Sequence, residues 1–186
     1  MSIEPDSILD FWFEEAGPKK WYNGGDAFDA EIRSRFESFT IETAAKLRRD
    51  GQHKWEDDPN SGLALIIALD QFPRNMFRAT KAAFAFDDLA LLLAQRAVDR
   101  GYDLKIGQDR RAFFYMPYMH SENLKIQDEC IRLIDMRLDN ANNLHHAREH
   151  RKLIAKFNRF PHRNAILGRQ STPEEQRFLN AGGYSP

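Results

Sequence analysis

The sequence predicts an all-α protein in which antiparallel helical hairpins form a compact bundle of seven to eight helices. Apolar residues recur at helical spacing almost everywhere, and no segment shows a convincing run of alternating apolar and polar residues. The connectors are short, which favours antiparallel neighbours. No linker rich in proline, glycine or serine divides the chain, so residues 1–186 are predicted to form one domain.

Eight segments carry the helical spacing, and residues that break helices separate them. In chain order they lie within residues 8–16, 28–50, 63–72, 88–100, 110–116, 122–140, 144–157 and 173–181. Gly17 ends the first segment, and a polar loop is expected over residues 19–26. Gly51 suits the left-handed C-cap of the second, and Gly101 closes the fourth. Pro73 must end or kink the third.

The predicted helix starts carry side chains that can accept hydrogen bonds from free backbone N–H groups. The candidate caps are Ser61, Asp87 or Asp88, Asp109, Ser121, and Asn142 or Asn143. The last helix has the clearest start. Thr172 suits its N-cap, Pro173 suits the first helical position, and Glu175 completes a capping box.

Composition and charge disfavour several classes of partner. The chain has 42% hydrophobic and 30% charged residues, which is typical of a globular protein, and its net charge of −1 argues against nucleic acid and membranes as partners. The charge is uneven. Residues 1–60 carry fourteen acids against eight Lys or Arg, whereas residues 145–169 carry seven Lys or Arg against one Glu. A local basic surface is therefore predicted near the C-terminal end.

The location expected from the sequence is the cytoplasm. The single cysteine, Cys130, cannot form an internal disulfide, and its place on an apolar helical face predicts a buried thiol in a reducing compartment. The opening MSIEPDSILDFWF lacks the basic segment of a signal peptide. The longest uninterrupted apolar run, residues 63–69, is far too short to span a bilayer.

Asp70 is a candidate site residue because it follows this apolar run. A buried carboxylate is costly unless it is paired, and Arg74 lies one helical turn further on. The alternatives are a structural salt bridge and a role as a general base or as the residue that orients one. His120 and Glu122 lie at a predicted helix start, where free N–H groups favour anions, and His120 follows an aromatic segment expected to be buried.

Two further groups of polar residues lie in the second half of the chain. His150 shares a helical face with apolar residues, so it is expected to point inward. It is either a core histidine bonded to a backbone carbonyl or a residue that exchanges protons. The sequence FPRN at residues 72–75 returns as FPHRN at residues 160–164, so two helix ends present matched Arg and Asn side chains. Four cations between Arg159 and Arg169 could bind a carboxylate or phosphate. Solvated loop charge and capping of helix carbonyls are the structural alternatives.

These features predict one polar site at the helix ends. Its predicted walls are Phe72, Phe114, Tyr115 and Phe160; its predicted catalytic residues are His120, His150, Asp70 and Glu122; and its predicted ligand-binding residues are Arg74, Asn75, Arg159, His162, Arg163 and Asn164. No metal site is predicted, because these residues do not stand at a diagnostic metal-binding spacing. The sequence indicates no particular cofactor. It also contains no GxSxG nucleophile motif, glycine-rich phosphate loop or GxGxxG motif.

Three motifs resemble a known family. ALDQFPRNMFR at 68–78, FYMPYMHSE at 114–122 and FNRFPHRNAILGR at 157–169 resemble the uncharacterised bacterial family called domain of unknown function 924. The resemblance covers nearly the whole chain, and it implies an all-helical fold similar to the tetratricopeptide-repeat superfamily. The chain departs from the family pattern at Ala79 and Asn158, where glycines are expected. The family brings no established activity, so the resemblance informs the fold and leaves the function open.

Two hypotheses of function remain. In the first, the arginines hold a small anionic ligand while His120 or His150 exchanges protons, and whether the protein is an enzyme stays open. In the second, a tetratricopeptide-repeat-like scaffold binds a protein or peptide. The aromatic surplus, with fourteen Phe, would also suit the interface of a homo-oligomer.

Overall fold

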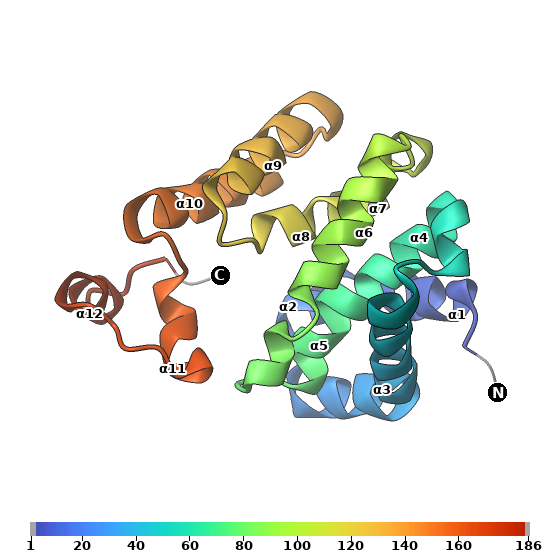
Figure 1. Ribbon diagram of the computed structural model, residues 1–186, viewed down its shortest axis with the longest axis horizontal. Coiled ribbons are helices and arrows are strands. Elements are labelled where there is room, and N and C mark those ends of the chain that lie inside the picture. Colours follow the sequence, from blue (N-terminus) through green and yellow to red (C-terminus); the bar gives the residue numbers. More distant parts are fainter. Residues whose placement is uncertain (1–2, 185–186) are drawn as a thin grey trace.

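Helices joined by short turns make up the fold (Figure 1). The structure is a computed structural model that describes residues 3–184, with the side chains of residues 22 and 23 left out. The α-helical segments in this part are α1 Pro5–Asp10, α2 Gly17–Asn23, α3 Gly25–Asp50, α4 Pro59–Ile66, α5 Phe72–Met76, α6 Asp87–Asp99, α7 Gln108–Arg111, α8 Met116–Met119, α9 Leu124–Arg137, α10 Ala141–Phe157, α11 Asn164–Leu167 and α12 Pro173–Asn180. Residues 3–184 contain no strand, so the all-α prediction is confirmed.

The number of helices in the described part of the chain exceeds the seven to eight predicted, because π-helical and 3₁₀ turns divide predicted helices and because α2 and α11 were not predicted. Pro73 illustrates the first cause. It has no N–H to donate, and the third predicted helix widens before it into a π-helical turn, Ile67–Gln71, instead of ending. The N–H of Phe72 then bonds to the carbonyl of Ile67, and α5 continues the helix. Asp70 lies in this widened turn.

Most predicted helix starts are displaced. Residues 19–26 were expected to form a loop, but most of them belong to α2 and to the start of α3. The predicted caps other than Thr172 are wrong: the N-cap residues are Asp58 for α4, Phe86 for α6, Gly107 for α7, Asn123 for α9 and Asn140 for α10. Asp58 illustrates the reason, because Pro59 suits the first helical position and extends α4 backwards. The capping box of Thr172 and Glu175 is confirmed.

The main core surrounds α4. Both α1 and α6 pack against α4, and α3 packs against α5. Every residue from Leu63 to Leu69 is at most 1% exposed, so the central position predicted for this segment is confirmed. The predicted burial of Cys130 is also confirmed. No helix within residues 3–184 is both long enough and apolar enough to cross a membrane.

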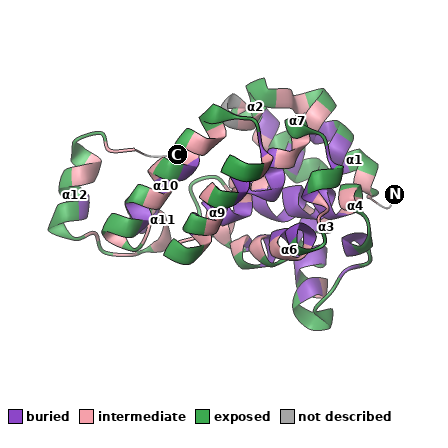
Figure 2. Cartoon of the chain, turned by 90° about the horizontal axis from the view of Figure 1, so that it is seen from above, coloured by how far each residue is buried: buried purple, intermediate pink, exposed green. Residues whose placement is uncertain are grey.

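The C-terminal part of the chain has a small apolar cluster of its own. α9 and α10 pack on each other as a hairpin joined by residues 138–140. Leu153 and Ile154, near the end of α10, form a buried cluster with Phe160 that is separate from the main core. Figure 2 shows buried residues gathered in the body of the molecule, whereas α12 is largely exposed, with Glu175 as its buried residue. α9 and α10 join the main core through apolar residues such as Cys130 and Ala147, whereas polar contacts carry much of the connection between the chain after α10 and the body.

The two positions where the resemblance predicts glycine have a backbone suited to glycine. Ala79 and Asn158 have φ angles of 60° and 56°, and they are the non-glycine residues with positive φ in the described part of the chain. The left-handed conformation costs an ordinary L-residue roughly 1–2 kcal/mol, but asparagine tolerates it better. Both turns are therefore left-handed, and Ala79 carries more backbone strain than Asn158.

Replacing Ala79 by glycine should stabilise the protein. We expect Ala79→Gly to raise the free energy of unfolding by about 0.5–1 kcal/mol, because relief of strain exceeds the extra chain entropy of glycine. The matched variant Asn158→Gly should gain less. Urea denaturation measures both changes, and a larger gain at Asn158 than at Ala79 would contradict this account.

Candidate functional site

Asp70 is fully buried, and three side chains satisfy its carboxylate. Its Oδ1 atom lies 2.8 Å from His120 Nδ1 and 3.4 Å from Arg74 Nη1, and its Oδ2 atom accepts a 2.6 Å hydrogen bond from Gln71 Nε2. Burial raises the pKa of Asp70, but the charge of Arg74 and the contacts with His120 and Gln71 outweigh it and lower the pKa to about 2. The carboxylate is therefore ionised at neutral pH and can only accept hydrogen bonds.

The backbone around His120 is fixed from α9. His120 follows α8 directly, and its N–H bonds to the carbonyl of Met116. Buried Gln127 donates hydrogen bonds of 2.7 Å to the carbonyl oxygens of Met119 and Ser121, one on each side of His120. These bonds hold the imidazole against Asp70, which lies 50 residues earlier in the chain.

The two ring nitrogens of His120 are in different states. Nδ1 must carry the proton, because the ionised carboxylate of Asp70 accepts hydrogen bonds only. Nε2 has no hydrogen-bond partner among the described residues, and the side chain is 16% exposed. Burial and the charge of Arg74 lower the pKa of His120, although Asp70 acts in the opposite direction. The ring is therefore neutral near pH 7, with a lone pair on Nε2 that can accept a proton.

A chain of ion pairs extends from Asp70 to the C-terminal part. Arg74 makes two hydrogen bonds to Asp87, at 2.9 and 3.1 Å, in the first turn of α6. Oδ2 of Asp87, which accepts one of these bonds, also lies 3.4 Å from Nη1 of Arg163. We call Asp70, His120, Arg74, Asp87 and Arg163 the Asp70 network. It joins segments that lie far apart in the sequence.

Arg163 and His162 contribute buried nitrogen atoms that lack partners. Arg163 is 6% exposed, and its Nε atom has no hydrogen-bond partner; the same holds for His162 Nδ1. Burial and the charge of Arg74 lower the pKa of Arg163 to about 10, so the guanidinium remains charged. Burial and the neighbouring Arg163 lower the pKa of His162 to about 4, so its ring is neutral at pH 7.

Glu122 ties the C-terminal part to the chain after α8. Its carboxylate accepts a 2.8 Å hydrogen bond from the N–H of Phe160 and two bonds of 2.7 and 2.9 Å from Arg169. Arg169 also donates to Asn164 Oδ1 and to the Phe160 carbonyl. We call this group the Glu122 clamp. Both carboxylate oxygens of Glu122 accept hydrogen bonds within the clamp, so Glu122 has a structural role.

The other predicted site residues have partners of their own. Asn75 donates to the carbonyl of Gln71, and Arg159 makes two bonds to Glu175, at 2.6 and 2.7 Å. His150 is 4% exposed and its Nδ1 lies 2.8 Å from the carbonyl oxygen of His146, as expected for a core histidine. Asn75 and Arg159 therefore bond away from the Asp70 network.

The residues predicted to wall the site belong mainly to the core. Phe72, Phe114 and Tyr115 are fully buried in the main core. Phe72 stacks on Phe36 with ring centroids 4.7 Å apart, and the hydroxyl of Tyr115 is bonded to Asp103. Phe160 is the exception, because it lies against the side chains of Arg163 and His150.

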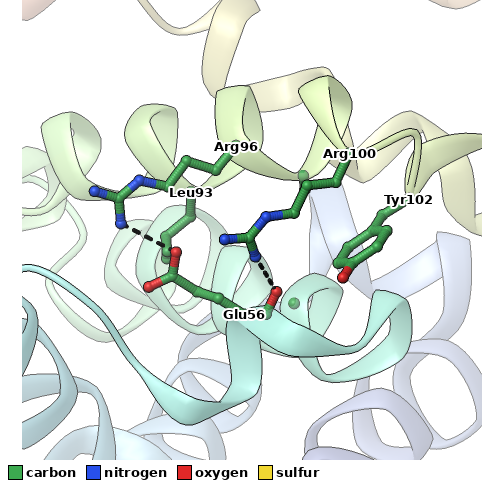
Figure 3. Close-up of a pocket in the computed structure, with 7 residues that line it drawn as sticks. Glu56, Leu93, Arg96, Arg100 and Tyr102 are labelled. Carbon is green, nitrogen blue, oxygen red and sulfur yellow. Dashed lines mark hydrogen bonds and ion pairs between the residues drawn. The ribbon is translucent and has the colours of Figure 1, made fainter.

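Two hollows lie away from the Asp70 network: one between α4, α6 and the 3₁₀ turn Lys54–Asp57, and one between the end of α3, this turn and Arg100. One has a volume of about 10 Å³, enough for one water molecule. Figure 3 shows Arg96 and Arg100 reaching Glu56 there, through its carboxylate and its backbone oxygen respectively. The other, of about 490 Å³, is an open surface hollow lined mainly by charged residues, including Lys46. Neither is lined by a predicted site residue.

Sequence reasoning missed four residues that complete these contacts: Gln71, Asp87, Gln127 and Arg169. Asp87 was interpreted only as a helix cap, although an acid in the first turn of a helix can also form ion pairs with arginines that are distant in the sequence. Arg169 was counted among four loop cations that could bind a carboxylate or phosphate, but its pairing with Glu122 was not predicted. No local pattern indicates Gln127, because its partners are backbone carbonyls. Within residues 3–184, no three His, Cys, Asp or Glu side chains are grouped to hold a metal ion.

Comparison with known proteins confirms the family resemblance. The family described as bacterial protein of unknown function (DUF924) matches residues 8–183. The chain belongs to this family. A solved structure of a protein of unknown function from Agrobacterium tumefaciens is similar, with 40% sequence identity and a TM-score of 0.86 over 96% of this chain and 97% of that chain. No curated protein matches the chain.

The three motifs on which the sequence resemblance was based contain most of the polar contacts described above. The motif at 68–78 supplies Asp70 and Arg74, the motif at 114–122 supplies His120, and the motif at 157–169 supplies Arg163. Asp87 lies between the first two motifs and connects the arginines. The similarity to tetratricopeptide-repeat proteins remains a prediction.

The buried histidines should make the protein less stable in acid. Burial lowers the pKa of His150 to about 3, so the unfolded chain binds a proton below pH 6.5 that the folded protein rejects. Stability should therefore fall as the pH drops from 6.5 towards 3. Between pH 7 and pH 5, His150→Gln should lose about 2 kcal/mol less unfolding free energy than the unsubstituted protein. The exposed control His145→Gln should leave the loss unchanged in urea denaturation, and equal losses in all three proteins would refute the assignment.

Proposed function

We propose that this protein binds a small anionic ligand at the Asp70 network and that His120 acts there as a general base. The observation that carries the proposal is the 2.8 Å contact between buried Asp70 and His120 Nδ1, with Nε2 left free. A general base needs a lone pair and a pKa that keeps it unprotonated at the working pH. Both conditions are met by the neutral ring of His120.

Asp70 acts through His120 in this proposal and is a positioning residue. Its carboxylate selects the tautomer with a proton on Nδ1 and would stabilise the imidazolium that forms when Nε2 accepts a proton. The same oxygen, Oδ1, faces Arg74, so the orientation of the carboxylate is fixed from two sides. His150, bonded to a backbone carbonyl, supports the packing around Phe160.

The proton that His120 accepts comes from water or from the ligand. The thiol of Cys130 is buried and its pKa is raised, so it is no nucleophile at neutral pH. The neighbouring Ser121 hydroxyl accepts a hydrogen bond from the N–H of Asn123, 3.2 Å away. The reaction class that suits this arrangement is activation of a water molecule or abstraction of a proton from the bound anion. We place the protein in the cytoplasm, because a single free thiol suits a reducing compartment.

A screen of small anionic metabolites by thermal shift tests this function. A ligand at 100 times its dissociation constant should raise the unfolding temperature by about 5–10 °C, since it binds only the folded state. His120→Gln should lower any turnover of that ligand by at least about 100-fold, while the matched control His145→Gln should retain it. Turnover that survives His120→Gln would exclude His120 as the base. A peptide or protein captured equally well by both variants, with no anion bound, would favour the scaffold function instead.

A further inference from the structure

Arg163 differs from the other arginines near the site. Arg74, Arg159 and Arg169 each donate two hydrogen bonds to one carboxylate: those of Asp87, Glu175 and Glu122, respectively. Arg163 instead has one long contact, 3.4 Å from Nη1 to Asp87. Its guanidinium therefore keeps an edge, formed by Nε and Nη2, that no carboxylate in the described part of the chain occupies.

Two aromatic rings hold this guanidinium in place. The central carbon of Arg163 lies 4.6 Å from the ring centre of Phe84 and 4.5 Å from that of Phe160. The side chain has little freedom left to lose when it binds a ligand, because these contacts fix it and it is 6% exposed. The Nε–H group is nevertheless without a partner, which is rare for a buried donor.

His162 adds a second unpaired nitrogen next to Arg163 in the chain. Its Nδ1 is buried without a hydrogen-bond partner, and its ring lies against Phe160, with centroids 5.6 Å apart. A neutral imidazole can place its proton on either nitrogen, so Nδ1 is able to donate a hydrogen bond. Adjacent residues thus bring two unused donors against the same aromatic ring.

We propose that the Nε–Nη2 edge of Arg163, together with Nδ1 of the preceding residue His162, binds the carboxylate of a small monocarboxylate ligand. This inference rests on the proposed function, because it names the chemical group that binds the network. Two parallel N–H groups on one guanidinium edge match the two oxygens of a single carboxylate. The apolar body of the ligand would lie against the ring of Phe84, which is partly exposed, whereas Phe160 is fully buried.

The charges of the network disfavour a ligand with two negative charges. Asp70 and Asp87 balance Arg74 and Arg163, and Glu122 balances Arg169 in the clamp. A carboxylate adds one negative charge to these balanced groups. A dicarboxylate or a doubly charged phosphate adds a second, which would face ionised Asp70 and Asp87 in a poorly solvated region. The network therefore discriminates against dianions.

Isothermal titration at pH 7.5 with linear monocarboxylates from propionate to hexanoate tests the inference on the full chain. We expect at least one to bind at least about tenfold more tightly than succinate or inorganic phosphate. Arg163→Lys keeps the charge but removes the paired N–H groups, so it should weaken this binding at least about tenfold. The control Arg148→Lys, an exposed arginine on α10, should bind within about twofold of the unsubstituted protein.

A second measurement needs no variant and guards against loss of the fold. In nitrogen-15 NMR spectra of the unsubstituted protein, the monocarboxylate should shift the Nε resonance of Arg163 and the ring nitrogens of His162. Tighter binding of phosphate, unchanged binding by Arg163→Lys, or no shift at Arg163 would each overturn the inference. If these tests fail while His120→Gln still abolishes turnover of another anion, the proposed function stands without this carboxylate site. If His120→Gln also leaves turnover unchanged, both the carboxylate site and the proposed function are excluded.

Discussion

The burial of one carboxylate inside an apolar helix is the constraint on which the rest of the site depends. Asp70 lies in a π-helical turn between Leu69 and Pro73, where water cannot solvate its charge. An isolated buried charge is prohibitively costly, and removing one partner of such a pair typically costs about 3–5 kcal/mol. Gln71, Arg74 and His120 stabilise this charge by hydrogen bonds and an ion pair. Arg74 and His120 are in turn held by further polar contacts, and these contacts make up the rest of the network.

This network connects the body of the molecule to its C-terminal part. Arg74 forms a second ion pair, with Asp87. Asp87 in turn forms an ion pair with Arg163, which lies beyond α10 in the chain. The Glu122 clamp makes a parallel connection through the backbone of Phe160. Apolar packing contributes less here, because the C-terminal cluster is separate from the main core. Polar contacts thus set the distance between His120 and Arg163, the two groups that the proposed site requires.

The sequence predicted the helical class and the meeting of three distant motifs better than it predicted local detail. The helical spacing of apolar residues and the apolar run Leu63–Leu69 are strong sequence patterns. A carboxylate at the end of such a run is buried and must be paired with hydrogen-bond donors or cations. The π-helical turn before Pro73 was not predictable, because proline excludes one hydrogen bond without specifying how the helix responds. Asp87 was missed for a related reason. A first-turn acid satisfies its own helix dipole locally, and only the folded structure shows that Arg74 and Arg163 also reach it.

The protonation of His120 tests the central claim most directly. Nitrogen-15 NMR of the imidazole distinguishes the two tautomers and the charged ring, and the absence of the signals in His120→Gln assigns them. The account predicts that at pH 7 Nδ1 carries the proton and Nε2 does not, with a titration midpoint below the ordinary value of 6.5. A proton on Nε2 in the neutral ring, or a charged ring at pH 7, would contradict the account, because His120 would then have no lone pair to act as a base.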